Sequence, residues 1–154
     1  MENYLKQDAY YDTIGFTSST NLVFLKNELV GFFTLKKQKL NIEVDISDAD
    51  SSEIEELDYE YSLDIARLAV KKDCQDNGIG TKIISKIIDI AISANERFVT
   101  LDSLIEKVEW YTKRGFISMI EEESRVSNKE GLVYMFMDLY DDSIVEAYFE
   151  EEAS

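Results

Sequence analysis

The sequence contains no histidine and only one cysteine, Cys74, among its 154 residues. Without histidine the chain cannot form a Ser-His-Asp triad, use a histidine general base or bind a metal through imidazole. A single cysteine excludes an internal disulfide, a Cys-x-x-Cys redox pair and a cysteine-rich zinc site. Because no histidine is present to activate it, we interpret Cys74 as a loop residue rather than a nucleophile. We expect no metal site.

Proline is absent, and long hydrophobic runs are also missing. No uninterrupted apolar stretch approaches the ~18 residues that a membrane-spanning helix needs. The amino terminus lacks the basic and then apolar layout of a signal peptide. With 45% apolar residues, a chain of this length is typical of one domain with an ordinary core. The composition therefore predicts a single soluble, cytoplasmic domain over residues 1–154 that has no membrane partner.

Positive charge is scarce, with 16 basic against 32 acidic residues and a formal net charge of −16. Residues 43–60 contain nine acidic residues and residues 141–154 contain six, without any Lys or Arg, so the remaining body is nearly neutral. The plainer interpretation is an acidic loop and an acidic tail that keep the protein soluble. The alternative is an electrostatic funnel that concentrates cationic molecules and repels RNA. A nucleic-acid partner is therefore not expected.

Hydrophobic patterning predicts strands in the first half of the chain. Apolar stretches on either side of a polar break at residues 26–28 predict a β-hairpin over residues 21–35. Residues 45–56, rich in Ser, Asp and Glu, predict a loop. Residues 59–70 predict a strand, and the nearly continuous apolar run at its end is typical of a central strand covered on both faces.

Residues 81–95 are rich in isoleucine, a β-branched residue, but their spacing favours a helix. Apolar residues recur at three- and four-residue steps, while polar residues fall on the opposite side. Further along, the pattern predicts a strand at 98–102, a helix at 104–113 ended by Gly115, and strands at 117–120 and 132–139. A short amphipathic helix after Ser143 could dock on its own domain or on a second copy of the chain.

The loop that leads into the isoleucine helix carries the most informative pattern. Gly78 and Gly80 stand at the predicted helix start, where glycines allow close backbone approach and free N–H groups carry partial positive charge. A phosphate or pyrophosphate fits this arrangement, and the plainer alternative is a loop that merely connects strand to helix. The loop lacks the Gly-Lys-Ser/Thr ending of a Walker loop and the third glycine of a dinucleotide fingerprint. The lysines that could neutralise phosphate charge are Lys71, Lys72 and Lys82.

Two blocks of sequence stand about 30 residues apart. Residues 75–80 read Gln-Asp-Asn-Gly-Ile-Gly after a strand ending in Arg-Leu-Ala-Val, and residues 110–116 read Trp-Tyr-Thr-Lys-Arg-Gly-Phe. They resemble the Gln/Arg-x-x-Gly-x-Gly/Ala pyrophosphate loop and the aromatic-Tyr-x-Lys-x-Gly-Phe signature of the GCN5-related N-acetyltransferase (GNAT) family. With the hairpin strand before them, the likeness covers roughly residues 21–120. One departure is that an Asn frequent in the second block, three residues before a small residue, is replaced here by Ile105, with Val108 at the small position.

The resemblance implies an α+β (α/β) fold. Its central sheet would be mixed and mostly antiparallel, with six to seven strands that splay between strands 4 and 5 and helices on its flanks. Acetyl-coenzyme A would bind in the splay as cosubstrate, with its pantetheine arm paired to backbone atoms of Leu68 and Val70. The pyrophosphate would rest on the loop and helix start, at Gln75, Asp76, Gly78, Ile79, Gly80 and Thr81.

The resemblance also implies two catalytic side chains. Tyr111 would protonate the departing thiolate as a general acid, unless it is only a core aromatic residue. An amine acceptor is mostly protonated at neutral pH, so acetyl transfer needs a proton acceptor. Asp64 is the candidate, because some family members carry a carboxylate there and because, without a bulge, it shares a face with Leu68 and Val70. Glu60 acting through water is the next choice, and an exposed ion-paired acid is the plainer interpretation of both.

The expected function is therefore an acetyl-CoA-dependent N-acetyltransferase that transfers acetyl directly to a primary amine of a cationic small molecule, protein or peptide. One alternative is the toxin branch of the family, which acetylates aminoacyl-tRNA and pairs with an antitoxin, although the two acidic blocks disfavour RNA. A second alternative is a catalytically silent coenzyme-binding or interaction module. A homodimer through the apolar positions near residues 144–149 also stays open.

Overall fold

A mixed six-stranded sheet organises the protein, whose computed structural model describes residues 2–40, 61–118 and 131–140. Strand order across the sheet is β1-β2-β3-β4-β6-β5, and every neighbouring pair is antiparallel except the parallel pair of β3 and β4. The elements follow one another along the chain as α1 (Glu2–Ile14), β1 (Ser19–Leu25), β2 (Glu28–Lys39), β3 (Tyr61–Val70), the 3₁₀-helix η2 (Lys72–Asn77), α2 (Ile79–Ser93), β4 (Phe98–Leu104), the 3₁₀-turn η3 (Ile105–Lys107), α3 (Val108–Thr112), β5 (Ile117–Ser118) and β6 (Leu132–Asp138). This is the α+β arrangement that the sequence predicts.

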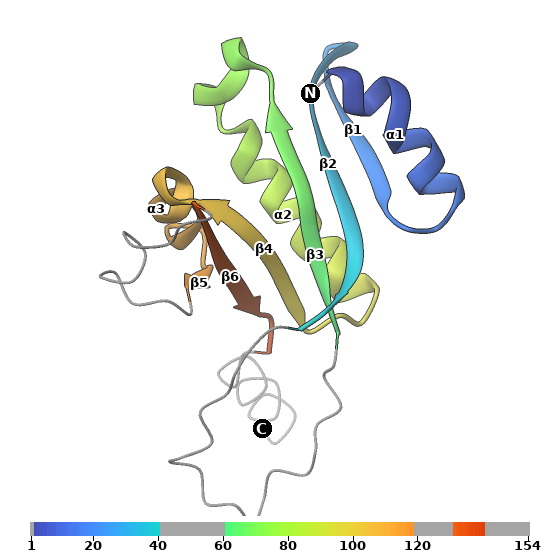
Figure 1. Ribbon diagram of the computed structural model, residues 1–154. Coiled ribbons are helices and arrows are strands. Elements are labelled where there is room, and N and C mark those ends of the chain that lie inside the picture. Colours follow the sequence, from blue (N-terminus) through green and yellow to red (C-terminus); the bar gives the residue numbers. More distant parts are fainter. Residues whose placement is uncertain (1, 41–60, 119–130, 141–154) are drawn as a thin grey trace, which may run out of the picture.

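The two longest helices cover opposite faces of the sheet, α1 near β1 and α2 beside β3 and β4 (Figure 1). Adjacent residues of β2 demonstrate this, because Phe32 packs with Tyr4 and Ala9 of α1 whereas Phe33 belongs to the main core with Ile87 of α2. Side chains alternate between the faces of a strand. The core beneath α2 is the larger of the two.

Local sequence signals for the hairpin and for the isoleucine helix are confirmed. Leu25 pairs with Glu28, so the hairpin has a two-residue loop in which Lys26 and Asn27 both adopt positive φ, at 49° and 67°. Such a turn matches the twist of the flanking strands. In α2, burial of the apolar stripe outweighs the intrinsic preference of isoleucine for strands. Its buried residues are Ile79, Gly80, Ile83, Ile84, Ile87 and Ala91.

Two regions differ from the sequence-based expectation. The helix predicted at residues 104–113 is wrong in its first part, because Ser103 and Leu104 still pair with β6 and the helical segment is divided into η3 and the short α3. Gly115 follows with φ of 95°, the left-handed conformation expected at a helix end. Helix α1 was not predicted, because only Tyr4 and Ala9 are buried and they form no helical stripe.

Several expectations fall outside the described residues: the acidic loop 43–60, the acidic tail 141–154, Glu60, the end of the strand at 117–120, and the helix after Ser143. In the part of the chain that the structure describes, no helix is long and apolar enough to cross a membrane. The cytoplasmic location and the homodimer stay predictions.

Candidate active site

Strands β3 and β4 pair only near their beginnings, at Leu63–Val99 and Asp64–Thr100. Beyond that point β3 continues to Val70 and β4 to Leu104, and the two strands diverge toward the end where α3 lies (Figure 1). Among the described strands, this part of β3 pairs with β2 alone. Backbone N–H and C=O groups on its β4 side can therefore pair with an extended ligand. This is the predicted splay, and it lies between the third and fourth described strands.

A β-bulge interrupts β3 where the splay begins. Thr34 of β2 pairs with Arg67, but the next residue, Leu35, pairs with Ile65, so Ala66 has no counterpart on β2. One extra residue reverses the alternation of side chains between the two faces of the strand.

The bulge places Asp64 on the face opposite to the one expected. Leu63 and Ile65 belong to the core beneath α2, and Leu68 and Val70 pack against the same core. Asp64 lies between two of these residues and therefore faces the other side of the sheet. The shared face with Leu68 and Val70 was expected only without a bulge, and because a bulge is present Asp64 lies on the opposite face.

Asp64 is buried, with 5% of its surface exposed. Thr100 donates its hydroxyl proton to Oδ1 of Asp64 at 2.9 Å, and Nζ of Lys36 lies 3.9 Å from Oδ2. Burial raises the pKa of the Asp64 carboxyl above its usual value, while the Thr100 hydrogen bond and the Lys36 charge oppose this and the Asp102 charge adds to it. A carboxylate with a raised proton affinity is better suited to accept a proton than an ordinary aspartate is.

The glycine loop forms the start of α2 as the sequence predicts. Gly78 adopts φ 73° and ψ 10° and is the N-cap of the helix, and its carbonyl accepts the hydrogen bond of Lys82 N–H at 3.1 Å. The N–H groups of residues 79–81 therefore have no acceptor within the helix. A Cβ at Gly78 would have nothing within 4 Å, so the space beside this turn is open. Gln75 donates its side-chain amide to the Val70 carbonyl at 3.1 Å and thereby folds η2 back onto β3.

Gly80 makes room for a side chain of the second sequence block, and its predicted role in coenzyme binding stays a prediction. A Cβ built at this position would lie 2.9 Å from Cζ2 of Trp110, closer than real Cβ contacts allow. Gly80 therefore admits the indole ring of the second sequence block against the helix start of the first. The close approach is to a side chain of this protein, whereas a ligand can reach the turn from the side of Gly78.

A cation at the helix start comes from the second block. The Arg114 guanidinium lies 3.6 Å from the Trp110 ring centroid, and it donates through Nε to Thr81 Oγ1 at 3.0 Å and through Nη1 to the Trp110 carbonyl at 2.7 Å. Arg114 was not among the cations that the sequence pattern singled out, because it stands 33 residues from Thr81 in a variable position of the signature. Lys71, which was singled out, forms an ion pair with Glu28.

Tyr111 lies on the α2 side of the sheet. Its ring packs edge-to-face with Trp110 at 4.9 Å and with Phe116 at 5.7 Å, and it adds to the main core. Burial raises the pKa of its hydroxyl above the usual value, so the phenol keeps its proton through the neutral range. Tyr111 is thus a half-buried aromatic residue packed against the core, and its protonation state also suits a general acid. Cys74 is half-buried and packs against the same core.

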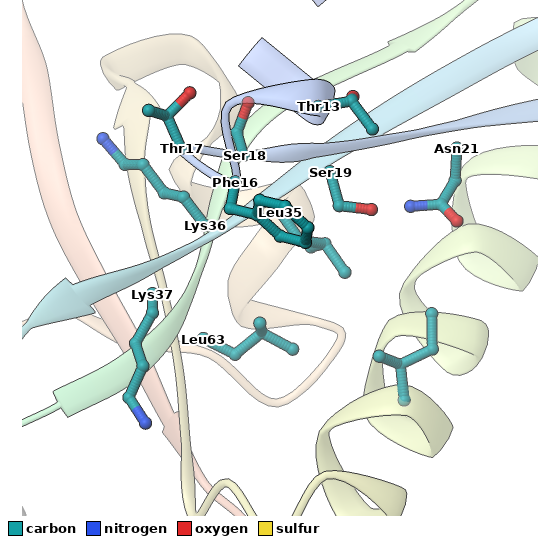
Figure 2. Close-up of a pocket in the computed structure, with 11 residues that line it drawn as sticks. Thr13, Phe16, Thr17, Ser18, Ser19, Asn21, Leu35, Lys36, Lys37 and Leu63 are labelled. Atoms are coloured by element: carbon teal, nitrogen blue, oxygen red, sulfur yellow. The ribbon is translucent and has the colours of Figure 1, made fainter.

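A cavity of about 460 Å³ is lined by residues of α1, β1, β2, β3 and α2 and of the turn after α1. Figure 2 shows the residues that line it, including Thr17 and Ser18 from the turn after α1 and Lys36 and Lys37 from β2. None of the site residues predicted from the sequence lines this cavity. Lys36, however, lines it and also faces Asp64.

Comparison with known proteins yields one family and a group of solved structures. A family model described as an acetyltransferase (GNAT) domain matches residues 2–140. No protein with a curated description matches the chain. Among solved structures, AtaTR bound with AcCoA is 16% identical with a TM-score of 0.65, over 95% of this chain and 83% of that one. A bacterial toxin is 15% identical with a TM-score of 0.67, over 96% and 80%. A GNAT family acetyltransferase from Elizabethkingia anophelis with acetyl-CoA bound is 16% identical with a TM-score of 0.56, over 87% and 84%. At these identities the structures demonstrate a shared fold.

Proposed function

The chain belongs to the GNAT acetyltransferase family, and on that premise we propose that it is an acetyl-CoA-dependent N-acetyltransferase acting on a primary amine of a cationic small molecule, protein or peptide. The observation that carries this proposal is the divergence of β3 from β4 directly after Asp64 and Thr100. It leaves the free backbone of β3, the glycine turn and a buried carboxylate around one opening.

The residues around the splay fit acetyl-CoA. On the β4 side of β3, Leu68 and the Val70 N–H can pair with an extended pantetheine arm, whereas the Val70 carbonyl already accepts the Gln75 amide. The free N–H groups of residues 79–81 and the Arg114 cation suit a pyrophosphate, which helix starts bind through their N–H groups and dipole. The structures of AtaTR and of the Elizabethkingia protein contain this molecule, which supports the assignment. When bound, acetyl-CoA supplies an acetyl thioester.

In the proposed transfer, the acceptor amine attacks the thioester carbonyl carbon, so that a C–N bond forms and the C–S bond breaks. Asp64 takes the proton that the amine nitrogen loses, and Tyr111 gives its phenolic proton to the departing thiolate. The two side chains lie on opposite faces of the sheet, and the splay lies between them. An acid and a base that serve different atoms of one reaction can thus approach from opposite sides.

The preference for a cationic acceptor rests on charge at the mouth of the splay. Asp102 of β4 is exposed, and its negative charge repels that of Asp64 and raises the pKa of the Asp64 carboxyl. Lys36 approaches Asp64 from β2 and offsets part of its charge, which leaves Asp102 to attract a second cationic group on the acceptor.

An acceptor screen tests the proposal by following thiol release from acetyl-CoA with polyamines, aminoglycosides, lysine-rich peptides and peptide amino termini. We expect turnover of at least one multiply charged amine and a higher KM for it in the Asp102→Asn variant, with KM for acetyl-CoA unchanged. Asp89→Asn, an exposed aspartate of α2, is the matched charge control and should leave both constants unchanged. A protein that turns over none of these amines would contradict the proposal and favour a silent coenzyme-binding module.

Acetylation of aminoacyl-tRNA is the second candidate, because the bacterial toxin resembles this fold over 96% of the chain. The acidic surplus and the exposed Asp102 weigh against RNA, which carries a dense negative charge. A salt-sensitive mobility shift of charged tRNA, with acetyl incorporation, would favour this candidate, and the lack of any shift at low salt would exclude it.

A further inference from the structure

Three polar side chains are buried together at the point where β3 and β4 separate. Ser62 and Thr100 are fully buried at 0% exposure, and Asp64 is 5% exposed. Thr100 Oγ1 donates to Asp64 Oδ1 at 2.9 Å, and Ser62 Oγ lies 2.7 Å from Thr100 Oγ1. The three side chains form one hydrogen-bonded chain across the last paired residues of the two strands.

The protonation state of Asp64 determines which group donates in each of these hydrogen bonds. Each hydroxyl carries one proton and can also accept hydrogen bonds. While Asp64 is ionised, Thr100 must donate to it, so Ser62 must donate to Thr100. When Asp64 holds a proton it can donate to Thr100, which then donates to Ser62, whose own proton can turn to the Gln38 carbonyl 3.4 Å away. Both protonation states of the carboxyl are therefore satisfied without moving the backbone.

Apolar residues would suit these two hydroxyl positions if packing were their only role. A buried hydroxyl is unfavourable without partners, and valine has nearly the shape of threonine. Here the two hydroxyls pair with each other, and Thr100 also pairs with the Asp64 carboxyl. Among the residues that the structure describes on other elements, the charged groups that face this carboxyl are Lys36 of β2 and Asp102 of β4. Thr100 donates a hydrogen bond to Oδ1, whereas the Lys36 ammonium lies 3.9 Å from Oδ2, so Thr100 is the residue that orients the carboxyl directly.

We propose that Thr100 and Ser62 are positioning residues of acetyl transfer: they orient the Asp64 carboxyl at the mouth of the splay and reverse their hydrogen bonds when it takes the proton of the acceptor amine. No bond other than these hydrogen bonds changes in the hydroxyl pair. The inference rests on the proposed function, which makes Asp64 the base.

The test uses the full-length protein in three variants. Thr100→Val removes the hydroxyl donor at nearly constant shape, and Thr100→Ser retains it. Ser62→Ala removes the outer hydroxyl of the hydrogen-bonded series. The first measurement is a ¹³C NMR titration of aspartate carboxyls in the free protein, with Asp64→Asn identifying the resonance. Because Thr100 stabilises the ionised form, we expect its loss to raise the titration midpoint of Asp64 by about one pH unit. Ser62→Ala should raise it by a few tenths of a unit, and Thr100→Ser should restore it.

The second measurement is the pH profile of kcat/KM with acetyl-CoA and an amine that the wild type acetylates. The acidic limb should move upward together with the NMR midpoint, with kcat lower by about tenfold in Thr100→Val and KM for acetyl-CoA unchanged. An active wild type whose Thr100→Val variant keeps both the titration and the profile would overturn the positioning role alone. A folded wild type that acetylates no amine would overturn the proposed function, and this inference with it. Circular dichroism confirms that each variant is folded.

Discussion

Gly80 and Trp110 form the contact that joins the two sequence blocks of the site. The indole ring lies against the first turn of α2, where a Cβ at position 80 would come within 2.9 Å of it. Arg114 stacks on the same ring and reaches Thr81 of that turn. Trp110 and Arg114 of the second block therefore pack against the helix start that is proposed to bind pyrophosphate.

Replacing Gly80 with alanine should destabilise the protein by about 1–3 kcal/mol, because the ring must shift to admit the methyl group. Coenzyme affinity should fall as well, since Arg114 moves with the ring. Thermal unfolding and calorimetric titration with CoA measure the two effects. The double variant Gly80→Ala with Trp110→Phe should recover part of the stability, because a smaller ring leaves room. Strictly additive losses in the two single variants would show that the contact is not strained by the methyl group.

Arg114 should contribute to coenzyme binding through both its charge and its planar shape. We expect Arg114→Ala to raise KM for acetyl-CoA about tenfold with kcat little changed, and more strongly at low salt, where exposed charges are less screened. The KM of Arg114→Lys for acetyl-CoA should lie between those of the wild type and Arg114→Ala, because an ammonium group retains the charge but stacks less well. The neighbouring Lys113 forms an exposed ion pair with Glu109, and Lys113→Ala is the control. Equal increases of KM in Arg114→Ala and Lys113→Ala would indicate that only the overall positive charge near the site matters, and not a specific contact of Arg114.

Removal of the Tyr111 hydroxyl separates its two roles. Tyr111→Phe preserves the ring that packs on Trp110 and Phe116, so the melting temperature should change little. If the phenol protonates the thiolate, kcat should fall by about 10²-fold or more, with KM for acetyl-CoA unchanged. Because burial raises the pKa of this hydroxyl above its usual value near 10, its ionisation should not reduce activity below that pH. Unchanged turnover in the variant would leave only the packing role.

Asp64 should have opposite effects on stability and on activity. Its pKa is raised in the folded protein, so the carboxyl favours folding below its unfolded pKa near 3.9, and this contribution is lost as the pH rises through the folded value. At pH 7 the buried carboxylate is therefore unfavourable. Asp64→Asn should unfold at a higher temperature than the wild type at pH 7, with the difference shrinking below pH 4, while kcat/KM falls by about 10²-fold.

The control for that prediction is Asp102→Asn, because Asp102 lies nearby on β4 and is exposed. Its replacement should leave the melting temperature nearly unchanged. If Asp64→Asn were less stable than the wild type at pH 7, then Thr100 and Lys36 would stabilise the carboxylate by more than burial disfavours it.

Short-range signals in the sequence predicted the parts of the fold that short-range physics governs. The spacing of the isoleucines from Ile83 to Ile87 places them on one helical face, and the polar break at Lys26 and Asn27 accommodates a tight turn. The glycine at position 78 allows the left-handed N-cap. The family resemblance rests on the same local blocks, which is why the GNAT fold and the glycine turn at the start of α2 could be predicted.

Tertiary structure alone decided which face Asp64 occupies, how the two blocks meet and which cation lies at the helix start. The bulge at Ala66 arises from the pairing of β3 with β2, which lies about thirty residues earlier in the sequence. The residues of β3 by themselves contain no signal that predicts it. Arg114 reaches Thr81 because Gly80 admits Trp110. The hydrophobic periodicity of a helix or strand depends on residues that are close in the sequence. Strand register and side-chain packing depend on segments far apart in the sequence that only folding brings together.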